Sequence, residues 1–578
     1  MNQLMEKMSL REKIGQLLCL HIKGIDYEDK DLDYLRVRNA ITEEHIGGLI
    51  LFHGEAKAAV RLLNEYQDLS RLPLLVSSDI ERGVGQILKG GTEFPTNMAI
   101  GATFHPEFTR MQGRITAIEA RAVGIHVAYA PVADVNSNPD NPIINIRSYG
   151  EDPHWVARFV EGYIQGVQGN DVLATAKHFP GHGDTAEDSH ARLPVLDITR
   201  NRFNRVESIP FRKSIESNVA QIMSAHIAFP ELTQKEKIPA TLSREILTGL
   251  LRDEMGFEGL IVTDALNMAG VADHFSEGEM AVLAMEAGVD ILLYPKSAKV
   301  VVDSLEKAVK SGRISEKRIE ESLIKILQAK EDLGLFDQRT VQLDKVLERL
   351  NTEESRQSAL EVARASITLV CPNKEFVPFK GIGNQPSQSL TNLRTAQCPG
   401  VSWFPLFRKS PVQLVIYDED SSDNVGESLI SELSHRDPSF NKPIIATPDN
   451  ISRLRDTLDR LEGDKTFVIA IFSRIASWKE RSGLNHKMIE SIDHLLDKHP
   501  KILVISFASP YIYNELQAPN MFICTYSSTV LSQIACVEAL YGEIPMRGLL
   551  PVSLKGYPLL SPVDQEELRE RSDSVHLA

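Results

Sequence analysis

Eight short apolar runs recur along the first 295 residues and constrain the fold more than any other feature of the sequence. Each run has the length of a strand and is rich in β-branched residues. Apolar runs that do not alternate with polar residues are typical of parallel strands buried on both faces. The runs lie at 15–22, 47–52, 73–79, 124–134, 172–179, 220–226, 259–266 and 288–295.

Segments between several of these runs have the apolar spacing of amphipathic helices, for example 106–123 and 244–255. Eight strand–helix units in series predict an α/β fold of the TIM type, a (β/α)8 barrel. Such a barrel uses about 250 residues or somewhat more. The 578-residue chain therefore has room for a second domain.

The pattern changes after residue 336. The segment 337–365 is charged and helical in pattern, and new strand-like runs then alternate with helical stretches such as 485–499. The new runs lie at 366–371, 412–418, 443–448, 466–473, 502–508 and 521–526. This alternation predicts a smaller, doubly wound α/β sandwich domain. We expect a catalytic barrel at 1–336, a linker and helix at 337–365, and the sandwich domain at 366–578, with a surface loop at 381–400.

Charge and cysteine content exclude several classes of function. The chain has 63 Lys and Arg against 79 Asp and Glu, a net charge of −16, which argues against binding to a phosphate backbone. Its five cysteines are scattered without C-x-x-C spacing, which argues against a disulfide framework or a zinc ribbon. There is no leader-like apolar segment and no run near the roughly 18 residues of a membrane span. These features predict a reduced, cytoplasmic enzyme.

Polar residues follow many of the apolar runs at the point where each run ends. The carboxyl ends of the strands of a parallel barrel converge on one mouth, so these side chains are expected to meet there. The alternative is that these residues are polar only because strands end at the solvent. That alternative explains less well a polar residue that comes directly at the end of an apolar run. The candidates are Asp79, Asp134, Lys177, His178, His226 and Asp264.

The segment 174–197 is the densest in chemistry-bearing side chains. His178, His182 and His190 could supply three metal ligands, but they lie in a loop that Pro180 and Gly181 keep from being helical. Paired histidines of an H-x-x-x-H metal site normally share one helix face. We therefore expect no metal at this segment.

The triplet Asp188-Ser189-His190 fits acid/base chemistry better. Side chains at i and i+2 of an extended segment point the same way, so the carboxylate can touch the imidazole and favour its protonated form. A loop-stabilising hydrogen bond without chemistry is the alternative, and spacing alone slightly favours it. Asp264, at the end of the seventh run, could act as a nucleophile, a base or a ligand. No G-x-S-x-G, phosphate-binding or dinucleotide-binding motif is present, and no cofactor is expected.

Two long motifs, KHFPGHGDTAEDSH at 177–190 and GLIVTDALNM at 259–268, resemble glycoside hydrolase family 3 in its β-N-acetylglucosaminidase branch. FPTNMAIGAT at 94–103, APVADVNSNP at 130–139 and RSYGEDP at 147–153 are similar to the same family. The segments 506–516 and 526–554 resemble its two-domain members. The resemblance spans almost the whole chain.

The resemblance implies a role for each candidate residue. Asp264 matches the nucleophile that forms a covalent glycosyl-enzyme, His190 the acid/base, and Asp188 its partner in an Asp–His dyad. Retaining cleavage needs a nucleophile on one face of the sugar and a proton donor at the leaving oxygen. The implied substrate contacts are Lys177, His178, Arg147 and Asp79, with Asp134 and His226 as secondary members of the site.

The resulting expectation is a retaining exo-β-N-acetylhexosaminidase acting on a small carbohydrate, a GlcNAc-containing glycoside such as an imported cell-wall or chitin fragment. A phosphorylase stays open, because a histidine repels an anionic acceptor less than a carboxylate does. The Asp188–His190 dyad argues against a β-glucosidase, whose acid/base in this family is typically a Glu from the second domain. Intact Asp264 and His190 argue against a non-catalytic sugar-binding protein.

The segment 79–88 departs from the family pattern. The family run is Asp-x-Glu-Gly-Gly followed by a basic residue, whereas here Arg82 replaces a Gly and Ile87 stands where a second basic residue is often found. Ala265 follows Asp264 where single-domain relatives often carry a second Asp, although two-domain members share the Ala. We expect subsites beyond the first sugar to differ from those of muropeptide-cleaving relatives.

Overall fold

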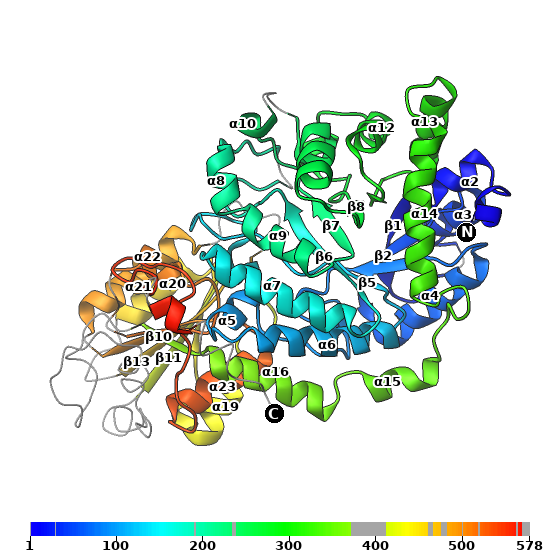
Figure 1. The fold of residues 1–578 in the computed structure, drawn as a ribbon. Coiled ribbons are helices and arrows are strands. Elements are labelled where there is room, and N and C mark those ends of the chain that lie inside the picture. The colour runs from blue at the N-terminus through cyan, green and yellow to red at the C-terminus, as the bar shows by residue number, and fades with distance from the viewer. Residues whose placement is uncertain are drawn as a thin grey trace. The chain divides into compact units, whose positions relative to one another are not determined.

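The structure is a computed structural model that describes residues 2–28, 30–189, 192–233, 238–370, 412–459, 466–475, 483–499, 501–517, 519, 521–561 and 564–568. Contacts between residues group the chain into two compact units (Figure 1), each assembled from three chain segments. The first unit is Met1–Glu93, Thr109–Asn138 and Val156–Arg356, and the second is Phe94–Phe108, Pro139–Trp155 and Gln357–Ala578.

Eight parallel strands of the first unit form a barrel in the order β8-β7-β6-β5-β3-β2-β1-β9. A parallel bridge between Val262 and Ile291 closes β8 onto the chain that enters β9. Each strand lies within one of the eight apolar runs or overlaps it, which confirms the predicted barrel fold. The strands are β1 (Leu18–Gly24), β2 (Gly48–Glu55), β3 (Leu75–Ser78), β5 (Val127–Ala128), β6 (Leu173–Phe179), β7 (Gln221–Ser224), β8 (Leu260–Val262) and β9 (Leu292–Leu293); β4 (Leu88–Lys89) pairs with β2 beside this path.

Helices between the strands account for the amphipathic segments. The segment 106–123 forms α6 (Glu107–Ala122), and 244–255 forms a helix of π type over Glu245–Glu254. The remaining helices that lie wholly or mainly in this unit are α1 (Asn2–Met5), α2 (Leu10–Gly15), α3 (Leu32–Glu43), α4 (Ala56–Leu69), α7 (Pro153–Gln168), α8 (Arg200–Arg205), α9 (Ser208–Glu216), α10 (Pro230–Thr233), α11 (Ala269–Ala272), α12 (Glu277–Ala287), α13 (Ala298–Lys310), α14 (Glu316–Asp332) and α15 (Val346–Arg349).

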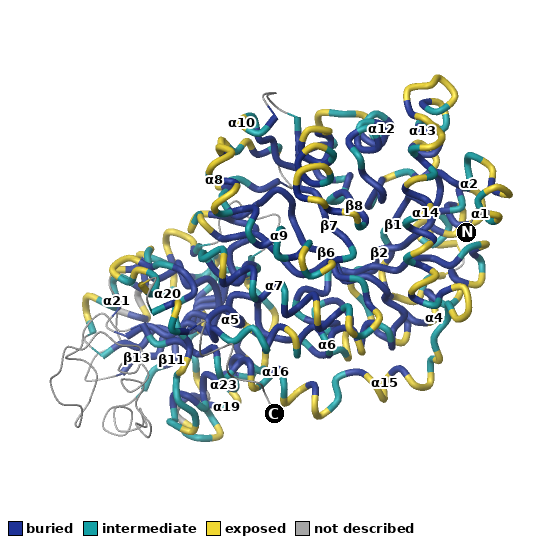
Figure 2. Tube along the Cα trace, in the orientation of Figure 1, coloured by how far each residue is buried: buried dark blue, intermediate teal, exposed yellow. Residues whose placement is uncertain are grey.

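Alternate residues of the barrel strands face its interior. Cys19 on β1 lies 3.6 Å from Ser77 Oγ on β3 and 4.0 Å from the hydroxyl of Tyr129, so these three side chains share one interior layer. The strands are buried on both faces, and Figure 2 shows them as a dark blue centre with exposed residues on the surrounding helices and loops. Burial on both faces explains why the strand-forming runs are continuously apolar.

The second unit is built on a six-stranded sheet in the order β10-β15-β14-β13-β11-β12, with β10 antiparallel to β15 and every other pair parallel. This confirms the predicted second α/β domain. Side chains of β13 alternate between two core clusters, with Ile469 on one face and Ala470 on the other. The strands are β10 (Thr368–Val370), β11 (Val412–Asp418), β12 (Ile444–Ala446), β13 (Thr466–Phe472), β14 (Ile502–Ser506) and β15 (Phe522–Cys524).

Helices from distant parts of the chain cover the two faces of this sheet. Core residues of α19, α23 and α16 pack on one face, and those of α20, α21 and α5 pack on the other. The predicted helix at 485–499 is α21. These helices are α5 (Asn97–Gly101), α16 (Glu353–Ser366), α19 (Glu427–Arg436), α20 (Ile451–Asp459), α21 (His486–Lys498), α22 (Ile512–Glu515) and α23 (Val530–Leu540).

The helix α5 belongs to the second unit although it comes from the first hundred residues. Its Met98 and Ala99 are fully buried in the same core cluster as Met488 of α21. The predicted boundaries at 336 and 366 stay a prediction. They treat each domain as one continuous stretch, whereas each compact unit combines three chain segments. The predicted loop at 381–400 lies outside the described residues. Among the described helices, none is both long and apolar enough to cross a membrane.

Candidate active site

The candidate residues of the barrel follow the carboxyl ends of its strands, as predicted. Asp79 comes directly after β3, Lys177 and His178 end β6, and Asp264 follows β8 by two residues. Asp134 and His226 follow β5 and β7. In a parallel barrel these ends lie at one mouth, where enzymes of this architecture carry their active sites.

Lys177 joins two carboxylates at the mouth. Its Nζ lies 2.7 Å from Asp79 Oδ1 and 2.8 Å from Glu81 Oε1. The lysine and Glu81 side chains are 2% and 6% exposed, whereas Asp79 is 28% exposed. Burying an ammonium is costly, and two nearby carboxylates offset that cost. Asp79 is thus held in place while its side chain still reaches solvent.

Glu81 is a member of this cluster that the sequence alone did not single out. Its carbonyl accepts a hydrogen bond from Gln112 Nε2 at 3.1 Å, which fixes the turn after β3. The signal was present as an acidic residue at i+2 from Asp79. That spacing does not by itself reveal that both carboxylates share one lysine.

Asp134 is the anchor of the loop that follows β6. Its Oδ2 lies 2.7 Å from His178 Nδ1, and its Oδ1 accepts from the backbone amide of His182 at 2.7 Å. The backbone amide of His178 also donates to it at 3.2 Å. A carboxylate against Nδ1 places a proton on that nitrogen and fixes the orientation of the ring. The peptide bond between Lys177 and His178 is cis.

The loop that carries the predicted dyad is packed rather than open. His182 Nε2 lies 2.9 Å from Ser189 Oγ, and Thr185 Oγ1 lies 3.2 Å from His182 Nδ1. Asp188 and Ser189 are 7% and 1% exposed. His190 lies outside the described residues, so the Asp188–His190 pair stays a prediction.

The same loop lies against the segment that follows Asp264. A Cβ on Gly270 of α11 would approach the carbonyl oxygen of Ser189 to 2.6 Å, so only glycine allows this contact. The residue after Asp188 therefore packs on the chain just beyond Asp264. The structure brings together the two loops that are predicted to carry the nucleophile and the acid/base.

Asp264 is tied to its neighbours through the backbone. Its amide donates to the carbonyl of Ser224 at 3.2 Å, and its Oδ1 accepts from the amide of Ala265 at 2.7 Å. The side chain is partly exposed. The pairing continues the β7–β8 ladder to the mouth and leaves the carboxylate at its end.

His226 supports the turn after Asp264. It is fully buried; its Nε2 lies 3.1 Å from the carbonyl of Ala265, and its Nδ1 lies 2.8 Å from Thr241 Oγ1. Because a carbonyl oxygen only accepts, Nε2 is the donor. These contacts let His226 hold the Asp264 turn in place, and its predicted role as a secondary member of the substrate site stays a prediction.

Arg147 lies in the second unit, at the end of a short 3₁₀ turn over Asn145–Arg147. Its Nη1 donates to the carbonyl of Ile143 at 3.2 Å, and its own carbonyl accepts from Asn97 Nδ2 at 2.7 Å. The side chain is partly exposed. Its predicted role as a substrate contact stays a prediction.

Residues 79–88, which depart from the family pattern, are held by contacts of Arg82. Arg82 Nη1 pairs with Glu93 Oε1 at 3.1 Å, and its backbone amide donates to Gln86 Oε1 at 2.9 Å. Ile87 is 6% exposed, so it packs inward rather than facing a ligand. A basic side chain at 87 would need a different local structure.

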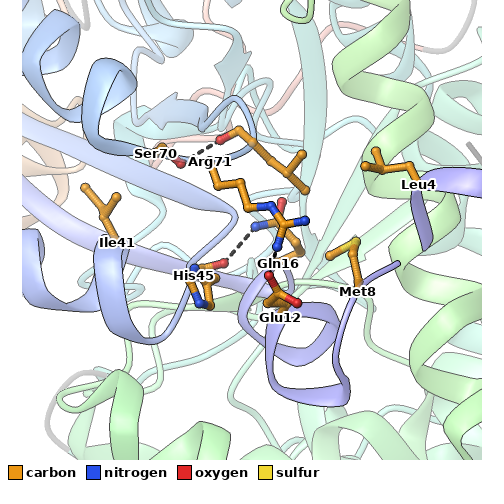
Figure 3. A pocket seen from close by; sticks show the side chains of 9 residues that line it. Leu4, Met8, Glu12, Gln16, Ile41, His45, Ser70 and Arg71 are labelled. Carbon is orange, nitrogen blue, oxygen red and sulfur yellow. Dashed lines mark hydrogen bonds and ion pairs between the residues drawn. The ribbon is translucent and has the colours of Figure 1, made fainter. Parts of the chain in front are cut away.

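A small hollow lies at the other end of the barrel, among the residues that precede β1 and β3, and Figure 3 shows the side chains that line it. Arg71 pairs there with Glu12, and Gln16 Nε2 donates to the carbonyl of His45 at 2.7 Å. Leu4, Met8 and Ile41 form much of the rest of its lining. This end of the barrel, which we call its base, is opposite the strand ends that carry the candidate residues. No group of three or more His, Cys, Asp or Glu among the described residues could hold a metal ion.

Comparison with known proteins places the barrel in a family. The model of the glycosyl hydrolase family 3 N-terminal domain matches residues 9–329. A β-N-acetylglucosaminidase/β-glucosidase of Cellulomonas fimi is 27% identical over 572 residues, 94% of each chain. β-Hexosaminidase A of Pseudoalteromonas piscicida is 33% identical over 372 residues, which are 59% of this chain and 62% of that relative.

Solved structures agree over almost the full length. A family 3 β-N-acetylglucosaminidase from Paenibacillus sp. str. FPU-7 is 30% identical with a TM-score of 0.77, covering 94% of this chain and 99% of that one. A β-glucoside phosphorylase is 25% identical with a TM-score of 0.81, covering 96% and 95%. The barrel, the second α/β unit and the matched family model together show that this chain belongs to glycoside hydrolase family 3.

Proposed function

We propose that this glycoside hydrolase is a retaining, exo-acting β-N-acetylhexosaminidase that releases terminal N-acetylglucosamine. The observation that carries the proposal is the mouth of the barrel, where the paired Lys177–Asp79 and His178–Asp134 groups share the strand ends with Asp264. Donors and acceptors in fixed pairs suit recognition of sugar hydroxyls. The relatives whose names state hexosaminidase or N-acetylglucosaminidase activity support this substrate class.

In the proposed mechanism Asp264 attacks the anomeric carbon and forms a glycosyl ester, while His190 gives its proton to the leaving oxygen. His190 then takes a proton from water, which attacks the same carbon and releases the sugar with its original configuration. Asp188 orients the imidazole and stabilises its charged form. Asp79, Lys177 and His178 hold the hydroxyls of the sugar, and Arg147 is a further predicted contact.

A phosphorylase is the second candidate, because a β-glucoside phosphorylase matches this chain at a TM-score of 0.81 over 96% of its length. In that reaction phosphate replaces water and the product is a sugar 1-phosphate. A histidine acid/base repels an incoming anion less than a carboxylate does. The two reactions share the first step and differ only in the acceptor.

The test measures turnover of 4-nitrophenyl N-acetyl-β-glucosaminide and of the matching β-glucoside, with and without phosphate. Faster release from the acetylated sugar, unaffected by phosphate, is expected. Acceleration by phosphate together with accumulation of sugar 1-phosphate would instead identify the phosphorylase. Absence of turnover of both substrates by the folded protein would contradict the proposal.

A further inference from the structure

An arginine that is not among the predicted site residues is bound to the loop that carries Asp188. Arg202 of α8 reaches this loop at Asp184, whose Oδ1 lies 2.9 Å from Arg202 Nη2. The same Nη2 donates to Ser137 Oγ at 3.1 Å, and that hydroxyl donates to Asp184 Oδ1 at 3.0 Å. Arg202 Nε lies 3.1 Å from Glu207 Oε1. The guanidinium therefore joins three parts of the barrel unit: the loop after β5, the loop after β6 and the turn between α8 and α9.

The two carboxylates that Arg202 joins differ in burial. The side chain of Glu207 is 6% exposed, whereas that of Asp184 is 24% exposed. Burial raises the pKa of the Glu207 carboxyl, and the charge of Arg202 opposes that effect. A guanidinium presents its donors in a rigid planar fork, so one side chain can hold both carboxylates at once. The buried glutamate thus anchors the arginine, and the arginine holds the aspartate of the loop.

Two glycines bring the same part of the loop against the segments that Arg202 joins. Gly181 has a φ of 138°, and a Cβ on it would approach Glu207 Cγ to 2.9 Å. A Cβ on Gly183 would lie 1.7 Å from the carbonyl oxygen of Val135 in the loop after β5. Only glycine allows so close an approach of backbone to backbone. The loop therefore lies directly on both neighbouring segments, with the Arg202 ion pairs beside these contacts.

Contacts inside the loop connect Asp184 to the predicted dyad. Asp184 lies two residues after His182 and four before Asp188. His182 is 1% exposed, and its Nε2 lies 2.9 Å from Ser189 Oγ, so both ends of this stretch are tied to each other. A displacement of Asp184 would therefore also displace Asp188. Displacing a group that takes part in the chemistry by about 1 Å can cost about 100-fold in rate.

We propose that Arg202 is a positioning residue for proton transfer: by holding Asp184 against the turn before α9, it sets the position of Asp188, which orients the proton donor of the proposed mechanism. This inference rests on the proposed function. Arg202 acts through the loop and does not touch the substrate. Its loss is therefore expected to impair protonation of the leaving oxygen more than attack by Asp264.

The experiment compares two substrates that share the transferred sugar but differ in their need for a proton. The sugar that leaves from N,N′-diacetylchitobiose must be protonated, whereas 2,4-dinitrophenyl N-acetyl-β-glucosaminide releases a phenolate that is stable without a proton. In Arg202→Met, kcat/KM is expected to fall about 30-fold for the disaccharide and less than about threefold for the aryl glycoside. Asp184→Asn removes the same ion pair from the side of the loop and should show the same selective loss. The double variant should lose about as much as either single variant, because all three lack the same contact.

Arg200→Met is the matched control, because Arg200 lies on the same helix, is 43% exposed and pairs with Glu254. Both rates should be unchanged in it. Equal losses on the two substrates, or no loss on either, in Arg202→Met and Asp184→Asn would overturn the positioning role. Failure of the folded wild type to turn over both substrates would instead reject the proposed function, so the two failures are distinguishable. Thermal unfolding shows whether each variant is folded, and Asp184→Asn alone decides the question if Arg202→Met is not.

Discussion

Two buried lysines mark the two ends of the barrel, and their partners differ. At the mouth, Lys177 lies within 2.8 Å of both Asp79 and Glu81. At the base, Lys330 of α14 is fully buried and donates to the amide oxygen of Gln16 at 2.7 Å. Burial lowers the pKa of Lys330 to about 7.

The comparison shows that burial alone does not determine how a lysine affects stability, because the groups that contact its ammonium differ. Lys177 meets two carboxylates, so an ammonium there is compensated, and it can serve to hold Asp79 toward a substrate. Lys330 meets a neutral amide, which fills its hydrogen-bonding capacity only in part and does not offset its charge. The charge of Lys177 is compensated by its two carboxylates, whereas a charge on Lys330 has no opposite charge beside it and is a cost to stability.

The largest expected effect is on turnover, and it distinguishes a carboxylate at the mouth of the barrel, Asp264, from one near its base, Asp290. Asp264→Asn should lower turnover about 10⁴-fold or more, because it removes the carboxylate that is the proposed nucleophile. The matched Asp290→Asn should keep turnover within about twofold but lower the free energy of unfolding by about 2–4 kcal/mol, since Asp290 pairs with Arg252 at 2.7 Å near the base. Steady-state kinetics and urea unfolding measure the two. Near-normal turnover in Asp264→Asn would contradict the mechanism.

The next effect concerns Lys177. Lys177→Met should lower kcat/KM about 100-fold to 1000-fold and also lower the melting temperature, because Asp79 and Glu81 are left facing each other without a cation. Kinetics with 4-nitrophenyl N-acetyl-β-glucosaminide and calorimetry measure these changes. If Lys330→Met lost as much activity, the distinction between mouth and base would be wrong.

A smaller effect, on stability alone, is expected for Lys330. Because its pKa in the folded protein lies below that in the unfolded chain, the unfolded state binds more protons between about pH 7 and 10.5, and wild-type stability gains from this group as pH rises through that window. Lys330→Met removes this dependence. Its free energy of unfolding relative to wild type should be about 1–3 kcal/mol higher at pH 7 than at pH 10. A pH-independent difference would show that Lys330 stays charged.

The smallest expected effect is on kcat and concerns the contact between Thr241 and His226. Thr241→Val removes the hydroxyl that lies 2.8 Å from His226 Nδ1, and should lower kcat about threefold to tenfold with little change in KM. Thr241→Ser should restore kcat, because it keeps the hydroxyl. Equal behaviour of the Val and Ser variants would mean that His226 does not position the Asp264 turn through this contact.

Much of the fold follows from local patterns in the sequence. The run at 412–418 coincides with β11. A short, continuously apolar segment is typical of a parallel strand that is buried on both faces of its sheet. The run at 124–134 was longer than β5, which has only Val127–Ala128. Pro131 has no amide hydrogen to donate, so the ladder continues there only as the isolated pairing of Val132 with Lys177.

The site was predictable as a set of residues but not as a set of pairs. Strand ends indicated Asp79, Asp134 and Lys177 separately. That Lys177 joins Asp79, while Asp134 anchors His178 and His182, depends on contacts between segments about 40 to 100 residues apart, which spacing does not encode. The packing of Gly270 on Ser189 was equally hidden, because it depends on the absence of a side chain.

The second unit takes two pieces of chain from within the sequence of the barrel, Phe94–Phe108 and Pro139–Trp155. These pieces precede the first strand of that sheet, β10, by more than 200 residues, so they can pack on the sheet only after the later strands have been synthesised. A fragment beginning at residue 357 would lack α5 and part of its own core. Arg147 lies on one of these pieces. Arg147 therefore takes its place with the sheet of residues 357–578, although in the sequence it stands between two segments of the barrel.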